Sequence, residues 1–382
     1  MSILLNNPDR FGYYTVGDHK TYSKLDAIEL HIQTGIHPTW HFNDEIFGSC
    51  DWINEPTESL DELYRIRAQQ IREKYDYVVL FYSSGADSQN MLNAFIRNGI
   101  HIDEIVNFWA KEGDDDYDSF FNAEIYHEAI PNTLKIVAEH PAIKHRVIDL
   151  TSIIAGLYND SDRRFDFLYD MNCMFSPNNY ARSFIRESIS EYKDITASGK
   201  NMCFVYGSEK PRLYLEAGKY CVRFLDILDN VVTPRTQRLN RSWEHDELFY
   251  WSPDLPELII KQAHVVMRYL KVATASSSGL STNPSYGSFG TKLVNGLPHY
   301  ITNHGVHRLL YNIVNPNTYK PPSIIFSDRD AWFLKNPSHS TSAANYLSGI
   351  QKLGTVLPAY WVNGVFDRGI KGCVSQPYWI ES

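Results

Sequence analysis

The order of the predicted elements indicates an α/β fold with a doubly wound parallel sheet. Residues 77–81, 104–110, 145–150 and 202–206 are short runs rich in β-branched and aromatic residues, which is typical of strands that are covered on both faces. Helical patterns separate these runs, and this alternation implies right-handed crossovers between parallel strands. Ligands of such sheets bind at the carboxyl ends of the strands, so the loops there are the candidate sites.

Composition narrows the class of protein. The chain has 382 residues, enough for one large domain or two ordinary ones, and its net charge of −9 argues against a general DNA-binding protein. No apolar run approaches the roughly 20 residues that span a bilayer, and no signal-peptide pattern is present. The five cysteines are scattered without a CxxC pair for zinc or an iron–sulfur cluster. We therefore expect a cytoplasmic protein with reduced cysteines and no membrane partner.

The first 60 residues predict a small α/β cap. Residues 11–18 are typical of a strand and a turn, and residues 23–33 of a helix with Ser23 as its N-cap. A surface helix is expected from residue 60 to residue 74, leading into the first strand of the main sheet.

The first strand, residues 77–81, breaks into a small polar turn at residues 83–88 and then opens a helix that Asn98-Gly99 ends. At such a turn, backbone N–H groups and the positive end of the helix converge, and small side chains let a ligand approach the backbone. The ligand that this arrangement suits is phosphate. A Walker loop would place Lys before Ser or Thr here, whereas this turn has Asp87-Ser88, which excludes a P-loop NTPase.

The turn resembles the PP-loop signature Ser-Gly-Gly-x-Asp-Ser/Thr of ATP pyrophosphatases, a family that includes asparagine, argininosuccinate and GMP synthetases. The matching residues are Ser83, Ser84, Gly85, Ala86, Asp87 and Ser88. Ser84 stands where the family usually has its first glycine. The resemblance implies an HUP/PP-loop, Rossmann-like domain over residues 61–272, in which this loop holds the pyrophosphate of ATP and Asp87 acts in catalysis and binds Mg²⁺.

The remaining elements follow in order. After the second strand, an acidic loop at residues 112–116 precedes a helix at about residues 119–140 that Pro131 kinks or breaks. A single helix is expected over residues 178–198, a further strand over residues 220–227, and an amphipathic helix through residues 259–270. In the PP-loop family the nucleoside lies beside the second strand, which by resemblance assigns cofactor contacts to Phe108, Trp109 and Ala110.

A second loop of interest follows the fourth strand, at residues 207–212. It combines Gly207 with a carboxylate, Glu209, and two cations, Lys210 and Arg212. A departing pyrophosphate needs such charge neutralisation, and the first loop has no lysine of its own. We therefore expect Gly207 to contact the cofactor, Glu209 to bind Mg²⁺, and Lys210 and Arg212 to act in catalysis.

Residues 273–382 form an irregular C-terminal region. Residues 275–290 are rich in Ser and Gly, the composition of a lid or linker, and residues 342–352 are expected to be helical. His299, His304 and His307 are too irregularly spaced to favour a metal site. We interpret this region as serving substrate recognition or the assembly of a homo-oligomer.

The resemblance implies an ATP- and Mg²⁺-dependent ligase. It would adenylate a substrate oxygen with release of pyrophosphate and then transfer an amine or ammonia, leaving AMP. The acceptor substrate, whether a small molecule, a nucleobase or a tRNA, is not identified by the sequence. Two alternatives stay open: an enzyme resembling phosphoadenosine-phosphosulfate reductases or sulfurtransferases, and a non-catalytic nucleotide-binding protein.

Overall fold

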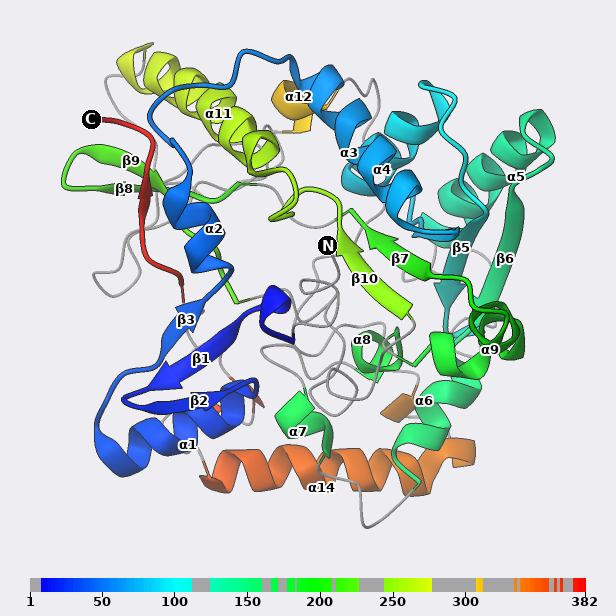
Figure 1. Cartoon of the computed structure of the whole chain (residues 1–382). Helices are drawn as coiled ribbons and strands as arrows, with labels where there is room; N and C mark the ends of the chain where they lie inside the picture. Colours follow the sequence, from blue (N-terminus) through cyan, green and yellow to red (C-terminus); the bar gives the residue numbers. More distant parts are fainter. Residues whose placement is uncertain are drawn as a thin grey trace.

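The computed structural model describes the following residues of the chain: 8–111, 124–159, 166–170, 177–182, 184–207, 211–226, 244–276, 307–311, 333–334, 337–356, 361–362, 365–366 and 374–382. Within them, a central parallel sheet is flanked by helices, and smaller antiparallel sheets lie beside it (Figure 1). The acidic loop at residues 112–116 and most of the Ser/Gly-rich stretch, from residue 277 onward, lie outside the described residues.

The central sheet confirms the predicted α/β class. Among the described residues it has five strands, all parallel, in the order β10-β7-β4-β5-β6. Their bounds are Tyr77–Phe81 (β4), Glu104–Trp109 (β5), Lys144–Asp149 (β6), Met202–Tyr206 (β7) and Glu244–Leu248 (β10). The chain builds outward from β4 to β6 and then returns to place β7 on the other side of β4. The strand order therefore reverses between β4 and β7, which is the position where ligands bind in open α/β sheets.

Helices cover both faces of this sheet. Successive residues of a strand point to opposite faces, and in β10 Asp246 bonds to Arg186 while Glu247 bonds to Arg67 of α3 (Leu60–Lys74). Tyr192 of α9 (Ser190–Ala197) packs on Phe204 of β7, with 5.3 Å between the ring centroids, on the face of Arg186. Helices α3, α4 (Ala86–Ile96) and α11 (Pro256–Ser276) pack together on the other face.

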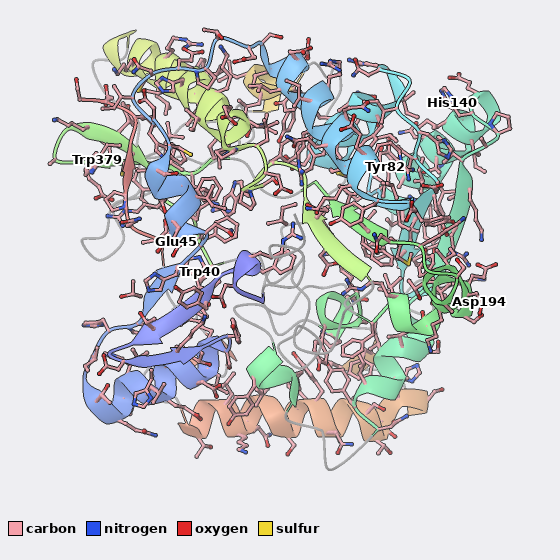
Figure 2. The ribbon with its side chains drawn as sticks, viewed as in Figure 1. Trp40, Glu45, Tyr82, His140, Asp194 and Trp379 are labelled. Carbon is pink, nitrogen blue, oxygen red and sulfur yellow. The ribbon has the colours of Figure 1, made fainter. Side chains whose placement is uncertain are left out.

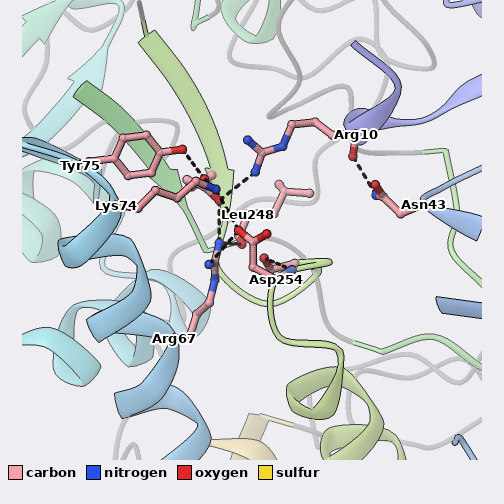
Figure 3. A network of polar contacts seen from close by, with 9 residues as sticks. Arg10, Asn43, Arg67, Lys74, Tyr75, Leu248 and Asp254 are labelled. Atoms are coloured by element: carbon pink, nitrogen blue, oxygen red, sulfur yellow. Dashed lines mark hydrogen bonds and ion pairs between the residues drawn. The ribbon is translucent and has the colours of Figure 1, made fainter. Parts of the chain in front are cut away.

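Glu247 is the centre of a buried charge cluster, shown in Figure 3. Its Oε2 accepts hydrogen bonds from Arg10 (2.9 Å) and Arg67 (2.7 Å), and its Oε1 accepts from Lys74 (3.0 Å) and from the hydroxyl of Tyr75. Burial by itself would raise the pKa of Glu247, but Arg10, then Arg67 and Lys74, hold it well below its usual range. We call these five residues the Glu247 cluster. It fastens the N-terminal segment and α3 to the edge strand β10.

Most predicted helices are confirmed, and one is wrong. Helix α3 has the predicted bounds. Pro131 lies in the first turn of α5 (Ile130–Glu139), where a π-helical turn at Glu124–Ala129 passes directly into the α-helix, so the helix changes type near Pro131 without breaking. The single helix expected over residues 178–198 is instead α8 (Pro177–Arg182), a 3₁₀ turn at Arg186–Ser188, and α9. Arg186, in the 3₁₀ turn between the two helices, pairs with Asp246 of β10. Both side chains are buried, and a buried charge needs a partner of opposite charge.

The N-terminal residues form a small unit of strands and helices. Its antiparallel sheet has the order β2-β1-β3, and two helices accompany it. The bounds are Tyr13–Val16 (β1), His19–Thr21 (β2), Thr39–His41 (β3), Lys24–Thr34 (α1) and Asp44–Ser49 (α2). Ser23 caps α1, accepting from the backbone N–H of Asp26, as predicted. Gly12 has φ +89° and no room for a Cβ beside Trp40, which is buried in this unit (Figure 2).

The C-terminal region is joined to the rest by strands, helices and aromatic contacts. Strand β13 (Tyr378–Trp379) pairs with β9 (Lys219–Val222), which pairs with β8 (Leu213–Glu216). The strand expected over residues 220–227 thus exists in part, but in this separate antiparallel sheet. Helix α14 (Ser340–Val356) contains the expected helix 342–352 and contacts α6 and α7. The other bounds are Thr151–Leu157 (α6), Asp166–Asp170 (α7), His307–Leu310 (α12), Trp361–Val362 (β11) and Val365–Phe366 (β12). No helix within the described residues is long and apolar enough to cross a membrane.

Candidate functional site

The two predicted loops meet at the point where the strand order reverses. One follows β4 at residues 83–88, and the other begins after β7 at Gly207. A Cβ on Gly207 would lie 3.0 Å from the backbone C and O of Asp87 and 3.1 Å from the backbone N of Ser88. These distances are shorter than nine in ten real Cβ contacts, so a larger residue would require the backbone of Asp87 and Ser88 to shift by a few tenths of an ångström. The sequence predictions for Gly207 and Asp87 thus refer to residues that are in contact.

Ser84 gives the first loop its shape. Its φ is +61°, in the left-handed region, which costs a residue with a side chain about 1–2 kcal/mol. The side chain is buried, and its Oγ accepts a hydrogen bond from Asn132 Nδ2 (2.9 Å) and bonds to the hydroxyl of Tyr82 (3.2 Å). Ser84 therefore adopts a backbone conformation typical of glycine, and buried hydrogen bonds hold it there.

Helix α4 begins directly after this turn. Its N-cap is Gly85, in extended backbone, which offers no side chain to the first-turn amides. The hydroxyl of Ser88 lies inside the loop, where it donates to Gly85 O (3.1 Å) and accepts from the backbone N of Ser83 (3.3 Å). The loop is thus folded by its own hydroxyls, while the positive end of α4 has no side-chain cap. This arrangement attracts an anion.

Asp87 lies in the first turn of α4, half-buried, beside two tyrosines. Its carboxylate Oδ1 accepts from the hydroxyl of Tyr311 (2.6 Å), and its backbone carbonyl accepts from the hydroxyl of Tyr250 (2.8 Å). The two tyrosine rings are stacked, with centroids 5.5 Å apart. Burial, followed by the charge of Asp87, raises the pKa of Tyr311 well above its usual value, so the hydroxyl stays protonated and donates. We call Asp87, Tyr250 and Tyr311 the Asp87 cluster.

Strands β4 and β5 separate just before the loop. The backbone N of Tyr82 still bonds to Val106 O (3.0 Å), but the carbonyl of Tyr82 accepts from the side chain of Asn107 (2.7 Å). Asn107 Oδ1 in turn bonds to His145 Nε2 (2.7 Å). Since a carbonyl only accepts, the Asn107 amide must point its nitrogen at Tyr82, and His145 must carry its proton on Nε2. These two hydrogen bonds, a relay from His145 through Asn107 to Tyr82, fix the backbone at the end of β4, next to the loop. Tyr82 is labelled in Figure 2.

The three residues that the sequence analysis expected to contact the nucleoside lie at the carboxyl end of the neighbouring strand β5. Phe108 packs on Phe81 with 5.6 Å between the centroids, and the guanidinium of Arg182 lies 5.1 Å from its ring centre. Trp109 packs against Tyr126, and Ala110 is buried. The structure brings these residues to the same edge of the sheet as the two loops.

Of the three charged residues predicted in the second loop, the structure describes only Arg212. Arg212 is buried just before β8, and its carbonyl accepts from the backbone N of Arg223 (3.3 Å). Lys210 and Glu209 lie outside the described residues. No group of three or more His, Cys, Asp or Glu side chains in the described part of the chain could enclose a metal. Mg²⁺ bound with a nucleotide needs only one or two carboxylates besides the phosphates, so Asp87 suits that ion.

Several residues of the site carried little signal in the sequence. Asn107 could have been noticed, since it is a polar residue within an otherwise apolar strand and is fully buried. Asn132, Tyr250 and Tyr311 lie far from the loop in sequence, with no pattern that links them to it. Only the folded structure shows that they bond to its residues.

Within the described residues, fold and site together define an α/β protein in which a Ser-rich turn and a helix start without a side-chain cap lie at the reversal point of a five-stranded parallel sheet. Comparisons with known proteins do not narrow this class, because no protein-family model and no curated protein sequence matches the chain.

Proposed function

We propose that this protein binds ATP at the loop of residues 83–88 and is an adenylating, AMP-forming enzyme that releases pyrophosphate. The observation that carries the proposal is the contact between the two loops at the reversal point, where Gly207 lies against the backbone of Asp87 and Ser88. The resemblance to PP-loop ATP pyrophosphatases supports it, because Ser84 adopts the backbone conformation typical of the glycine that it replaces.

Each part of the site has a role in this proposal. The first-turn amides of α4 bind the phosphates that become pyrophosphate, and Asp87 holds Mg²⁺ together with phosphate oxygens. Bound Mg²⁺ would neutralise charge that develops on those oxygens. Arg212 and Lys210 would supply positive charge at the second loop, and Glu209 would bind Mg²⁺. Phe108, Trp109 and Ala110 would line the nucleoside side, at the end of β5.

The proposed reaction has two steps. An oxygen of the acceptor substrate attacks the α-phosphorus of ATP, the bond to the β-phosphate bridging oxygen breaks, and pyrophosphate leaves. An amine or ammonia then attacks the activated carbon and displaces AMP. The chain's contribution is to position the phosphates and to stabilise the charge on the departing pyrophosphate.

The first test is binding of ATP by calorimetry with and without Mg²⁺, in wild type and Asp87→Asn. Loss of the carboxylate should weaken Mg²⁺-dependent binding at least tenfold, an expectation based on about 1.5–3 kcal/mol for an interaction with a charged group. Asp44→Asn is the control, because Asp44 lies in the N-terminal unit, away from the loop, where it bonds to His41 and to Tyr378 of β13. Equal binding by wild type and Asp87→Asn would reject the proposed site.

The second test concerns chemistry. Pyrophosphate release from ATP is measured across pools of nucleobases, nucleotides, amino acids and tRNA. Release that depends on one pool and is lost in Asp87→Ala supports the ligase. Binding of ATP without release from any pool would favour a non-catalytic nucleotide-binding protein, and tighter binding of adenosine phosphosulfate than of ATP would favour a reductase-like enzyme.

A further inference from the structure

Tyr311 joins the C-terminal region to the loop that carries Asp87. It follows helix α12 (His307–Leu310), lies 224 residues from Asp87 in sequence, and donates its hydroxyl to Asp87 Oδ1 at 2.6 Å. Its side chain is buried, and its ring stacks on that of Tyr250. The hydroxyl therefore has a fixed direction.

The segment that carries Tyr311 is itself held in place. The hydroxyl of Tyr64, in α3, donates to the carbonyl of Leu310 (2.8 Å) and accepts from Gln262 Nε2 of α11 (3.1 Å). Tyr64 also packs against Tyr311 and Tyr250, with centroids 6.2 and 6.0 Å apart. Two helices of the main domain thus fix residues 307–311 beside the start of α4.

A second bond fixes the backbone of the same residue. Tyr250 donates to the carbonyl of Asp87 and accepts from Asn90 Nδ2 (3.0 Å), one turn further along α4. With its backbone fixed by Tyr250, the carboxylate of Asp87 is oriented by the hydrogen bond that Tyr311 donates to Oδ1. A tyrosine hydroxyl orients a carboxylate without adding a charge of its own.

We propose that Tyr311 is a positioning residue that orients the Asp87 carboxylate for Mg²⁺·nucleotide binding and so couples residues 307–311 to that site. This inference rests on the proposed ATP site. By reciprocity, binding of Mg²⁺·nucleotide at Asp87 must stabilise the segment that carries Tyr311.

The test is a Mg²⁺ titration of nucleotide binding by Tyr311→Phe, which removes the hydroxyl and keeps the stacked ring. The ligand is α,β-methylene-ATP, which cannot release pyrophosphate. The half-saturating Mg²⁺ concentration should rise about tenfold, while binding in EDTA should change less than twofold. A purely structural defect would weaken both in proportion.

Two variants serve as controls. Tyr14→Phe removes a buried tyrosine hydroxyl that donates to Asp226 Oδ2 at 2.7 Å in another part of the molecule, and should leave the Mg²⁺ midpoint unchanged. Tyr250→Phe removes the bond to the backbone of Asp87 and should shift the midpoint less than Tyr311→Phe does. An equal or larger shift in Tyr250→Phe would overturn the role of the carboxylate bond.

A measurement on the wild type keeps the inference testable without any variant. Amide hydrogen exchange at residues 307–311 should slow when Mg²⁺·α,β-methylene-ATP is added, and not when the analogue is added in EDTA. If wild type binds the analogue but exchange and the Tyr311→Phe midpoint are unchanged, the role of Tyr311 is overturned and the ATP site stands. If wild type binds no analogue, both fail.

Discussion

The Glu247 cluster and the Asp87 cluster each contain a carboxylate that accepts a hydrogen bond from a tyrosine. They differ in their other donors, which are cationic side chains around Glu247 and a second tyrosine hydroxyl at Asp87. Glu247 is fully buried and accepts from Arg10, Arg67 and Lys74 as well as Tyr75. Asp87 is half-buried at the edge of the sheet and is held by the neutral hydroxyls of Tyr311 and Tyr250. The first carboxylate has its charge balanced by cations, whereas the two tyrosines that bond to Asp87 donate neutral hydroxyl groups.

This difference separates a structural carboxylate from a candidate ligand-binding one. A carboxylate already shared among cations gains little from a further cation, and removing it leaves buried positive charges. A carboxylate oriented by hydroxyls at the carboxyl end of a strand is suited to meet a metal–phosphate complex. The comparison therefore makes separate predictions for stability and for binding.

The largest expected effect is on stability, from Glu247→Gln. This change keeps the size of the side chain but removes the buried carboxylate that Arg10 and Arg67 both bond, so the free energy of unfolding should fall by about 3–5 kcal/mol. Urea denaturation measures it. Glu191→Gln is the control, because Glu191 is an exposed partner of Lys144 and Arg146 and its loss should matter far less. Equal effects of the two variants would remove the distinction drawn for the Glu247 cluster.

Gly207→Ala tests the contact between the two loops. The new Cβ would meet backbone atoms of Asp87 and Ser88 at 3.0–3.1 Å, so the loops must move apart. We expect a loss of about 1–3 kcal/mol in the free energy of unfolding, typical of overpacking, and a clear loss of ATP affinity. Gly156→Ala is a matched control at an open position of α6, where nothing lies within 4 Å, and should be neutral or stabilising. Retention of wild-type ATP affinity in Gly207→Ala would argue against a site between these loops.

Ser84 allows the backbone and side-chain contributions in the loop to be separated. Ser84→Ala and Ser84→Gly both lose the bonds to Asn132 and Tyr82, but only Ala keeps the cost of φ +61°. The Gly variant should therefore be more stable than the Ala variant by about 1–2 kcal/mol in thermal or urea unfolding. An Ala variant as stable as the Gly variant would show that the left-handed conformation is not retained.

The sequence was most informative where local chemistry decides the structure. The apolar run of β4, the small turn after it and the cap at Ser23, whose Oγ accepts from Asp26 N (3.3 Å), each act within a few residues. Strand β10 was not predicted, because Glu244–Leu248 is mostly polar. Its buried acids are compensated by distant cations: Arg10 is 237 residues from Glu247. No local pattern reveals such a pairing.

In the candidate site, too, the features set by neighbouring residues could be predicted and those set by distant residues could not. Residues 83–88 and Gly207 could be predicted from strand–turn chemistry, and the parallel sheet then brings them together. Whether these residues bind ATP stays a prediction. The side chains that fix the loop, Asn132, Tyr250 and Tyr311, come from other elements and could not be predicted, because a hydroxyl or amide has no sequence signature for a partner far along the chain.

The smallest expected effect concerns the relay behind the loop, and it appears as a dependence on pH. Burial lowers the pKa of His145, so the folded protein binds a proton at this site less readily than the unfolded chain does. Where the unfolded chain binds more protons, stability rises with pH. This contribution to stability is therefore complete above the unfolded pKa of about 6.5 and is lost as pH falls below it.

His145→Gln keeps an amide donor for Asn107 Oδ1 but cannot titrate. The unfolding free energy of the variant, measured in urea between pH 7.5 and pH 5, should fall less on acidification than that of wild type. Identical slopes would mean that protonation of His145 does not disturb the bond that Asn107 makes to the end of β4, and the Asp87 loop would then rest on a support insensitive to pH in this range.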